Sequence, residues 1–212
     1  MTGSIRNQNG KTPPVYSELK DALMNYFISD THFFHARAIG FDNRPFASVT
    51  EMDEEMIRRW NDRVTDDDTV YHLGDVSFGH EEETIALLNR LHGHIVLIKG
   101  NHDDKLLRSE SVAARFDSIK DYMELPLDER KRIVLFHYPV MSFRNQHHGW
   151  IHFYGHVHTT VPESLLASDY YHRLRESSGR NDFGQAWNVG CMMPYMDYTP
   201  RTAEEIMAVR AP

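Results

Sequence analysis

The amino-acid sequence predicts an α/β domain in which strands alternate with helices. Short apolar segments of strand length recur along the chain, and the segments between them repeat their apolar residues with helical spacing. This alternation is typical of sheets joined by crossover helices, which collect their ligands at the carboxyl ends of the strands. The predicted strands cover residues 24–29, 69–73, 94–98, 119–123, 132–137, 151–154 and 186–191.

The segment between the first two predicted strands is expected to form a crossover helix. Its apolar residues Met52, Met56, Trp60 and Val64 repeat every four residues, which places them on one face. Thr50 precedes them and is the expected N-cap residue, because its hydroxyl can accept from a free backbone N–H of the first turn.

Two further helices are predicted from their end signals. One covers residues 82–91, and Gly93 is expected to end it. The other begins near the C-terminus, where Thr202 and Glu205 have the spacing of a capping box, and continues to Val209.

The composition is that of a globular protein, since 41% of the 212 residues are hydrophobic and 25% are charged. We expect a single domain over residues 21–212, preceded by a loose N-terminal extension over residues 1–20 that includes one helical turn near residues 17–22. A lone cysteine, Cys191, and a start without a signal-peptide pattern favour a cytoplasmic location. No apolar run approaches the ~18 residues of a membrane span, so no membrane partner is expected.

The charge balance limits the kind of substrate. A formal net charge of -8 should repel long polyanions, so a phosphate-bearing substrate would need a local source of positive charge. The chain has 14 histidines beside its one cysteine, which favours nitrogen and oxygen ligands over thiolates if a metal is bound.

Polar residues of metal-ligand type stand where the predicted strands end. Because the carboxyl ends of neighbouring parallel strands meet at one edge of a sheet, these side chains are expected to converge. They are Asp30 and His32 after the first strand, Asp75 after the second, Asn101, His102 and Asp103 after the third, His137 at the end of the fifth, and His156 and His158 after the sixth.

This set of side chains suits two divalent cations. Imidazole nitrogen combined with carboxylate and amide oxygen favours Mn²⁺, Fe²⁺ or Zn²⁺ over Ca²⁺ or Mg²⁺. In such a pair, about 3.5 to 4 Å apart, a water held between the ions becomes a good nucleophile near neutral pH. The cations would also attract a phosphate group to a protein that is acidic overall.

Five short motifs follow one another along the chain: Asp30-Thr31-His32, Gly74-Asp75, Gly100-Asn101-His102-Asp103, His137 and Gly155-His156-Val157-His158. Each motif alone is weak evidence, but their joint occurrence in this order resembles the motif set of the calcineurin-like metallophosphoesterases. The longer strings SDTHFFHARAI, NRPF and GDVSFG resemble a small bacterial and phage branch of predicted phosphoesterases. The resemblance covers residues 21–158 and, more loosely, the chain from residue 186 onward.

The resemblance implies a four-layer αββα sandwich, in which two mixed β-sheets are flanked by helices, with a dinuclear metal site. One ion would be bound by Asp30, His32, Asp75 and His158, and the other by Asp75, Asn101, His137 and His156. His102 would protonate the leaving alkoxide, and Asp103 would steady the His102 ring. This agrees with general chemistry, because an alkoxide leaves readily only when a proton donor is at hand. The expected ions are Mn²⁺ or Fe²⁺, with Zn²⁺ or Ni²⁺ as alternatives.

His35 and Arg44 follow the first motif and lie in a region that is expected to overhang the metal site. They are candidates for binding phosphate oxygens, Arg44 through a bidentate fork, and an ordinary surface loop is the alternative. The segment 159–185 is long for a connection, so it is expected to be a lid, a contact surface or partly helical, and to influence substrate choice.

The predicted function is hydrolysis of a phosphoester by a metal-bridging hydroxide, with His102 as the general acid and Asn101 binding both metal and phosphoryl oxygen. A small or nucleotide-type phosphodiester is the preferred substrate, and a phosphomonoester is the alternative, because metal ligands specify the reaction better than the leaving group. A binding scaffold that has lost catalysis is expected to lack ligands, and this chain keeps them all.

A nuclease acting on short substrates is a further alternative. Arg173, Arg175 and Arg180, with the neighbouring Tyr170 and Tyr171, could supply a short basic groove with aromatic side chains. The acidic net charge argues against long nucleic acids.

Overall fold

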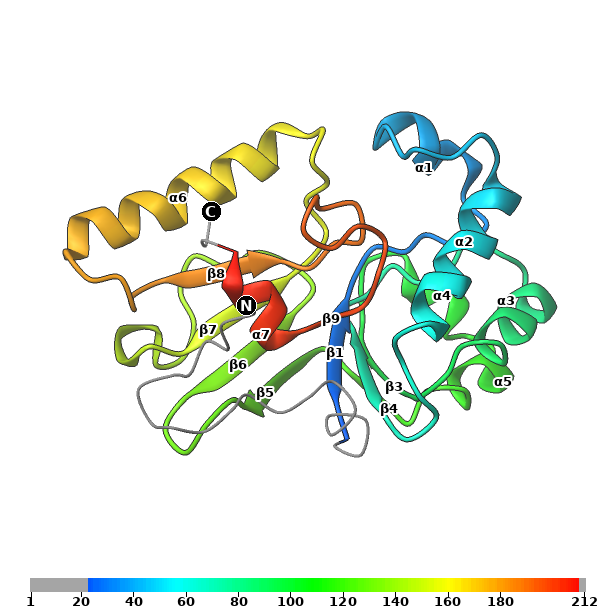
Figure 1. Ribbon diagram of the computed structural model, residues 1–212, viewed down its shortest axis with the longest axis horizontal. Coiled ribbons are helices and arrows are strands. Elements are labelled where there is room, and N and C mark those ends of the chain that lie inside the picture. Colours follow the sequence, from blue (N-terminus) through cyan, green and yellow to red (C-terminus); the bar gives the residue numbers. More distant parts are fainter. Residues whose placement is uncertain (1–22, 210–212) are drawn as a thin grey trace, which may run out of the picture.

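The computed structural model describes residues 23–209, so the predicted N-terminal extension and its helical turn lie outside the described residues. Figure 1 shows how the elements are arranged. In chain order they are β1 (Asn25–Ile28), α1 (Ala36–Phe41), α2 (Val49–Asn61), β2 (Thr69–His72), α3 (Glu81–Leu88), β3 (His94–Ile98), α4 (Asp103–Leu106), α5 (Glu110–Ala113), β4 (Ser118–Lys120), β5 (Tyr122–Pro126), β6 (Arg132–Phe136), the 3₁₀ helix η2 (Gln146–His148), β7 (Ile151–Tyr154), α6 (Pro162–Ser178), β8 (Gln185–Asn188), β9 (Arg201–Thr202) and α7 (Ala203–Ala208).

The strands form two mixed sheets. In the first sheet the order is β4-β3-β2-β1-β9, with β9 antiparallel to β1 and the other pairs parallel. In the second the order is β5-β6-β7-β8, with β5 antiparallel to β6 and the other pairs parallel. The parallel strands of each sheet therefore bring their carboxyl ends to one edge.

The two sheets face each other, and helices cover their outer sides. Phe27 of β1 and Phe153 of β7 are almost fully buried, and their rings meet edge to face with centroids 5.0 Å apart. Helices α2, α3 and α5 lie outside the first sheet and α6 outside the second (Figure 1). The predicted fold class, two mixed sheets flanked by helices in four layers, is confirmed.

Helix α2 has the predicted apolar face but a different start. Met52, Met56 and Trp60 are buried, as the four-residue spacing indicates. The N-cap residue is Ser48, whose hydroxyl accepts from the backbone N–H of Glu51. The prediction of Thr50 as N-cap is therefore wrong, because a serine two residues earlier offers the same chemistry.

The predicted strand 119–123 is in fact two strands in different sheets. Strand β4 pairs with β3 in the first sheet, and β5 pairs with β6 in the second. The chain crosses at Asp121, which forms an ion pair with Lys99 (2.7 Å). A short apolar run predicts extended backbone but does not specify the partner strand, so this change of sheet is not visible in the sequence.

The long segment 159–185 is mainly helical, which was one of the three possibilities. Pro162 begins α6, where its missing N–H costs no hydrogen bond, and Gly179 follows the helix with a positive φ of 63°. The last helix, α7, has the predicted capping box, in which Thr202 and Glu205 each accept from the other's backbone N–H.

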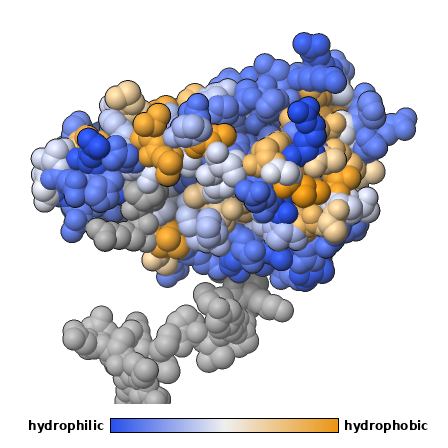
Figure 2. Space-filling view, turned by 90° about the horizontal axis from the view of Figure 1, so that it is seen from above, coloured by the Kyte–Doolittle hydropathy of each residue, from blue (hydrophilic) through white to orange (hydrophobic). Residues whose placement is uncertain are grey.

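The surface seen from above in Figure 2 is mostly hydrophilic and is interrupted by apolar patches. Exposed apolar side chains in the described residues include Phe41, Phe78, Met141, Leu165 and Leu166. Within residues 23–209 no helix combines the length and the apolar character needed to cross a membrane.

Candidate metal centre

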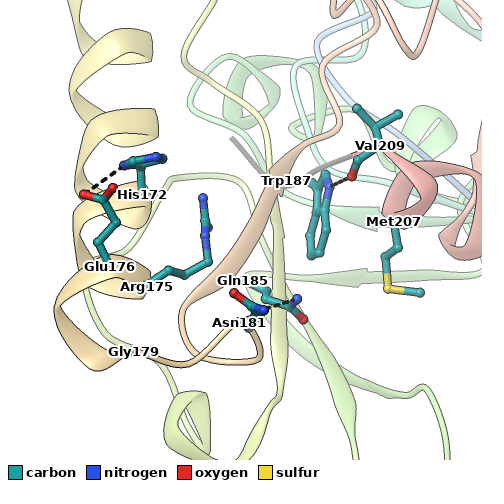
Figure 3. A pocket seen from close by; sticks show the side chains of 9 residues that line it. All are labelled: His172, Arg175, Glu176, Gly179, Asn181, Gln185, Trp187, Met207 and Val209. Carbon is teal, nitrogen blue, oxygen red and sulfur yellow. Dashed lines mark hydrogen bonds and ion pairs between the residues drawn. The ribbon is translucent and has the colours of Figure 1, made fainter.

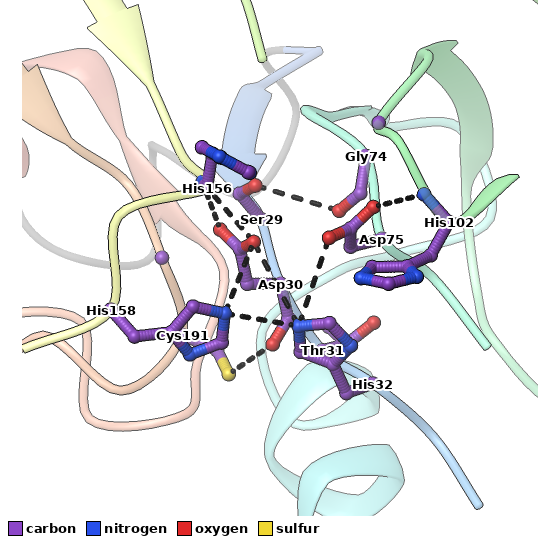
Figure 4. A network of polar contacts seen from close by, with 12 residues as sticks. Ser29, Asp30, Thr31, His32, Gly74, Asp75, His102, His156, His158 and Cys191 are labelled. Carbon is purple, nitrogen blue, oxygen red and sulfur yellow. Dashed lines mark hydrogen bonds and ion pairs between the residues drawn. The ribbon is translucent and has the colours of Figure 1, made fainter. Parts of the chain in front are cut away.

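The predicted ligands converge at the edge where the carboxyl ends of the strands meet, although they come from both sheets. Ligand atoms of Asp30, His32 and His158 lie within 4.8 Å of one another, and so do those of Asp75, His137 and His156. Figure 4 shows Asp30, His156 and His158 beside His32 and Asp75. These groups contain six of the seven side chains that the family resemblance implies as metal ligands, all except Asn101.

Asp75 lies between the two groups. Its Oδ2 is 3.9 Å from Nε2 of His32 and 3.6 Å from Nε2 of His137. Its Oδ1 accepts from the backbone N–H of His102 (2.9 Å), which holds the carboxylate in this orientation. This placement suits a carboxylate shared by two cations.

Asn101 completes the second group. Its Oδ1 lies 3.1 Å from Nε2 of His137. An amide oxygen in this place adds a neutral oxygen donor to imidazole nitrogens and a carboxylate, a mixture that suits Mn²⁺, Fe²⁺ or Zn²⁺.

Two of the predicted ligand histidines have their tautomer set by a hydrogen bond. Nδ1 of His137 donates to the carbonyl oxygen of Leu73 (2.6 Å), and Nδ1 of His158 donates to Oδ1 of Asp42 (2.7 Å). In each neutral ring Nε2 is therefore left with its lone pair, which is the form that binds a metal.

The buried His32 fits a metal ligand better than a structural histidine. Its side chain is 2% exposed, and burial holds its pKa well below its usual range, so the ring is neutral. Its Nδ1 is buried without a hydrogen-bond partner, and its Nε2 faces Nε2 of His158 at 3.2 Å. A cation bound by both Nε2 atoms would account for the close approach of these two rings.

The backbone is strained at four of the predicted ligands. Asp30, His32, Asp75 and His156 have φ angles of 55°, 50°, 58° and 68°, which residues with a Cβ adopt at a cost of about 1 kcal/mol or more each. Such strain is typical of functional sites, where surrounding contacts hold a side chain in a required direction.

Two motif glycines allow this close packing. Gly74 has a φ of 93°, and a Cβ on it would lie 2.7 Å from Nδ1 of His137. A Cβ on Gly155 would overlap the side chains of Ser29 and Asp30. At both positions the space that a side chain would need is therefore already occupied.

Asp103 has a different role from the one the sequence predicts. It is buried, and its carboxylate accepts from the backbone N–H groups of Asp75, Val76 and Gly100 at 2.8–3.0 Å. Asp103 therefore joins the loops after β2 and β3 and does not steady the His102 ring. The reason is that three backbone N–H groups donate to the two oxygens of this carboxylate.

His102 stands at the open side of the cluster. It is exposed, and its ring centroid lies 6.0 Å from that of His32 and 4.9 Å from that of Phe78. The ring of His35 is stacked on Phe78, with centroids 4.0 Å apart, and its centroid lies 5.7 Å from that of His32. Both histidines are thus close enough to the ligands to meet a bound substrate.

Arg44 lies where it cannot bind a substrate. Its side chain is fully buried, and it donates to Oδ2 of Asp42 (2.9 Å) and to the backbone carbonyl oxygens of Asp30 and Thr31. The expectation that Arg44 holds phosphate oxygens is not supported by this geometry. Its N–H donors instead hold the turn that carries the first two predicted ligands, Asp30 and His32.

Asp42 is the functional residue that the sequence analysis missed. One of its oxygens accepts from His158 and the other from Arg44. Asp42 therefore links the buried guanidinium of Arg44 to a predicted ligand histidine. Burial tends to lower the pKa of His158, but the hydrogen bond to Asp42 and the charges of Asp30 and Asp42 outweigh it and raise the pKa. The spacing Asp42-x-Arg44 was the available signal, and it is common in ordinary turns.

Another pocket, of about 740 Å³, lies away from these ligands. It is formed by the end of α6, the start of β8 and α7, and Figure 3 shows His172, Arg175 and Trp187 among its lining residues. None of the predicted metal ligands lines it, so it has no part in the chemistry described above.

Proteins similar to this chain come from several sources. The uncharacterized protein MJ1445 of Methanocaldococcus jannaschii is 39% identical over 135 residues, which cover 63% of this chain and 68% of that protein. The gene 66 protein of Mycobacterium phage D29 is 28% identical over 168 residues, which cover 68% of this chain and 82% of that protein. The crystal structure of the protein of unknown function AQ665 from Aquifex aeolicus has a TM-score of 0.64 at 28% identity, covering 89% of this chain and all of the other.

The sequence also matches the calcineurin-like phosphoesterase superfamily domain over residues 24–173. This match spans more than half of the chain and includes all seven predicted metal ligands. The chain therefore belongs to the calcineurin-like phosphoesterase superfamily.

Proposed function

We propose that this protein is a phosphodiesterase that hydrolyses small or nucleotide-type diesters and uses two divalent cations. Family membership implies metal-dependent phosphoester hydrolysis. The observation that carries the proposal is the position of Asp75 Oδ2 between His32 and His137, since it allows one carboxylate to serve two ion sites.

The residues present fit two ions. Asp30, His32 and His158 would hold one, His137, His156 and Asn101 the other, and Asp75 would serve both. Bound divalent cations supply Lewis-acid activation of water and neutralise the charge of the phosphoryl oxygens. Mn²⁺ or Fe²⁺ is our proposal for their identity, with Zn²⁺ or Ni²⁺ as alternatives, because the donors are imidazole, carboxylate and amide groups.

His102 is proposed to act as the general acid. The bond from its backbone N–H to Asp75 fixes the start of its side chain beside the cluster, and its imidazole is exposed to the hollow where a leaving group can lie. A proton from the imidazole N–H would pass to the oxygen of the departing alcohol, which otherwise leaves as a high-energy alkoxide.

Two of the three arginines that could form a nucleic-acid groove are paired with acidic side chains, which favours small substrates over polynucleotides. Arg173 is paired with Asp169 (2.8 Å), and Arg180 with Asp182 (3.0 Å). These partners cancel the positive charge on which a nucleic-acid groove depends.

The test combines metal analysis with a substrate panel. Purified protein would be stripped with a chelator, reloaded with Mn²⁺, Fe²⁺, Zn²⁺ or Ni²⁺, and assayed on diesters, monoesters, cyclic nucleotides and an oligonucleotide. We expect about two ions per chain and the highest kcat/KM on a small diester, with little dependence on salt. A steep loss of oligonucleotide hydrolysis with salt would instead indicate a nuclease, and full loading without any hydrolysis would indicate a binding scaffold.

A further inference from the structure

An apolar pocket adjoins the metal cluster on the side of the second sheet. It has a volume of about 460 Å³, within the range of small-molecule sites. Its walls are the segment Tyr138–Met141, which follows the ligand His137, and the first half of α6, and the ligand His156 lines it as well. The pocket is therefore continuous with the second group of ligands.

The two walls are tied together in a way that leaves the interior apolar. Tyr170 and Tyr171 of α6 donate their hydroxyl groups to the backbone carbonyl oxygens of Met141 (2.5 Å) and Val140 (2.7 Å). These bonds use up the phenol O–H groups, so the rings present hydrocarbon surface to the pocket. The same two bonds hold α6 at a fixed distance from the loop that follows His137.

Apolar side chains at the mouth of the pocket are exposed to solvent. Met141 on one wall is 69% exposed and Leu166 on the other is 67% exposed. Large exposed apolar groups beside a hollow are unfavourable in water and are typical of a surface that covers a ligand. Apart from the imidazole of His156 at its inner edge, the one acidic or basic side chain among the described residues that line the pocket is Glu163, whose negative charge disfavours a second phosphate there.

A second hollow adjoins the cluster on the side of the first sheet. It is lined by Asn101 and by the proposed acid His102, with Lys105 and Asp104 nearby. The two hollows thus flank the ligands, one polar and beside the acid, the other apolar and away from it.

A phosphodiester has two organic arms, and this arrangement separates them. The arm whose P–O bond breaks must lie beside the group that protonates it, which places it in the hollow at His102. Water supplies the new P–O bond, and the other arm stays on phosphorus. We propose, resting on the function above, that this retained arm is a flat aromatic group, such as a nucleobase or a phenyl ring, and that it binds in the pocket under α6.

Two neighbouring leucines of α6 permit a matched test. Leu166 lines the pocket, whereas Leu165 is similarly exposed (74%) and does not line it. Both side chains are on the surface, so Leu166→Asp and Leu165→Asp should unfold at temperatures close to that of the parent protein.

The substrates would be two diesters with the same leaving group, phenyl 4-nitrophenyl phosphate and ethyl 4-nitrophenyl phosphate, assayed with the Mn²⁺-loaded protein. We expect the parent protein to prefer the phenyl ester, and Leu166→Asp to lower this preference by about tenfold, mainly through KM, because a buried ring loses apolar contact. Leu165→Asp should keep the preference within about twofold.

Two results would overturn the proposal. One is an equal phenyl preference in both variants. The other is a change of oligomeric state in Leu166→Asp, measured by light scattering, with the preference unchanged, since the apolar mouth would then be a contact between subunits.

The pocket can also be tested without turnover. Phenylphosphonate and methylphosphonate have a P–C bond that hydrolysis does not cleave, and their affinities can be compared by titration calorimetry. The proposal requires the parent protein to bind phenylphosphonate about tenfold more tightly than methylphosphonate. In Leu166→Asp the two affinities should be similar. If no diester is hydrolysed but this difference is found, the proposed reaction fails while the pocket stands; if the difference is absent, the pocket fails.

Discussion

The Nε2 atoms of His32 and His158 face each other at a distance of 3.2 Å, although 126 residues separate them in the chain. Two nitrogens that each lie about 2.1 Å from one ion are about 3.0 to 3.4 Å apart when the angle at the ion is near 90–110°. The spacing of these rings is therefore that of two ligands of one cation. Asp42 behind His158 is what sets the direction of the second ring.

The first prediction concerns this bond between Asp42 and His158. In Asp42→Asn the amide oxygen can still accept from Arg44, but the amide N–H₂ then faces Nδ1 of His158. The imidazole would have to carry its proton on Nε2, the atom that should bind the ion. We expect about 10- to 100-fold weaker binding at one of two sites, measured by counting free Mn²⁺ by electron paramagnetic resonance.

Asp53→Asn is the matched control. Asp53 is also buried and accepts from the backbone N–H of Phe34, but it does not contact a metal ligand. The affinity of Asp53→Asn for Mn²⁺ should match that of the parent protein. Equal affinities in all three proteins would show that Asp42 does not orient His158.

The second prediction separates metal binding from proton transfer. Asp75→Ala removes the carboxylate placed between the two groups, so both ions and nearly all activity should be lost. His102→Ala removes no ligand and should retain both ions, while turnover falls most for esters with poor leaving groups, by about 10²- to 10⁴-fold. Metal content by elemental analysis and a plot of log kcat against leaving-group pKa check this, and loss of metal from His102→Ala would contradict it.

The third prediction tests the packing of Gly155 against Asp30. A methyl group there would overlap Ser29 and Asp30, so Gly155→Ala should lower the free energy of unfolding by about 1 to 3 kcal/mol and weaken metal binding. Gly40→Ala is the control, because Gly40 lies in α1 and nothing lies within 4 Å of its added Cβ. That variant should be as stable as the parent or more stable by about 0.5 to 1 kcal/mol. Urea unfolding without metal measures both, and similar changes would refute the packing argument.

The fourth prediction concerns pH and the buried His152. Burial lowers its pKa to about 4 from an ordinary value of 6.5, against the smaller opposite effect of the carbonyl oxygens of Val134 and Tyr138. The unfolded chain therefore takes up a proton more readily than the folded one between these values. The resulting stability is present above about pH 6.5 and is lost as the pH falls toward 4.

The loss between pH 7.5 and pH 5 should be about 2 kcal/mol for this residue. Its size follows from comparing urea unfolding of the parent protein and His152→Gln at the two pH values with a chelator present. The variant should show a smaller loss on acidification, and the exposed His94→Gln should behave like the parent. The same loss in His152→Gln would mean that His152 titrates normally in the folded protein.

The sequence alone was sufficient to predict which metal-ligand-type side chains converge, and most of the helices and strands. Asp30, Asp75 and His137 stand next to runs whose apolar residues predict strands, and the ends of parallel strands meet by geometry. Local signals also predicted the capping box of Thr202 and Glu205. These features depend on residues close together in the chain, so spacing and residue type are enough to predict them.

The tertiary structure alone decided which distant groups meet. It buried Arg44 against the carbonyl oxygens of Asp30 and Thr31. It directed Asp103 to the backbone N–H groups after β2, and it moved the chain from one sheet to the other at Asp121. It also placed α6 beside the loop after His137, which forms the apolar pocket. A single sequence does not encode such pairings in its spacing, because a buried polar group binds whichever partner the packing of remote segments brings within reach.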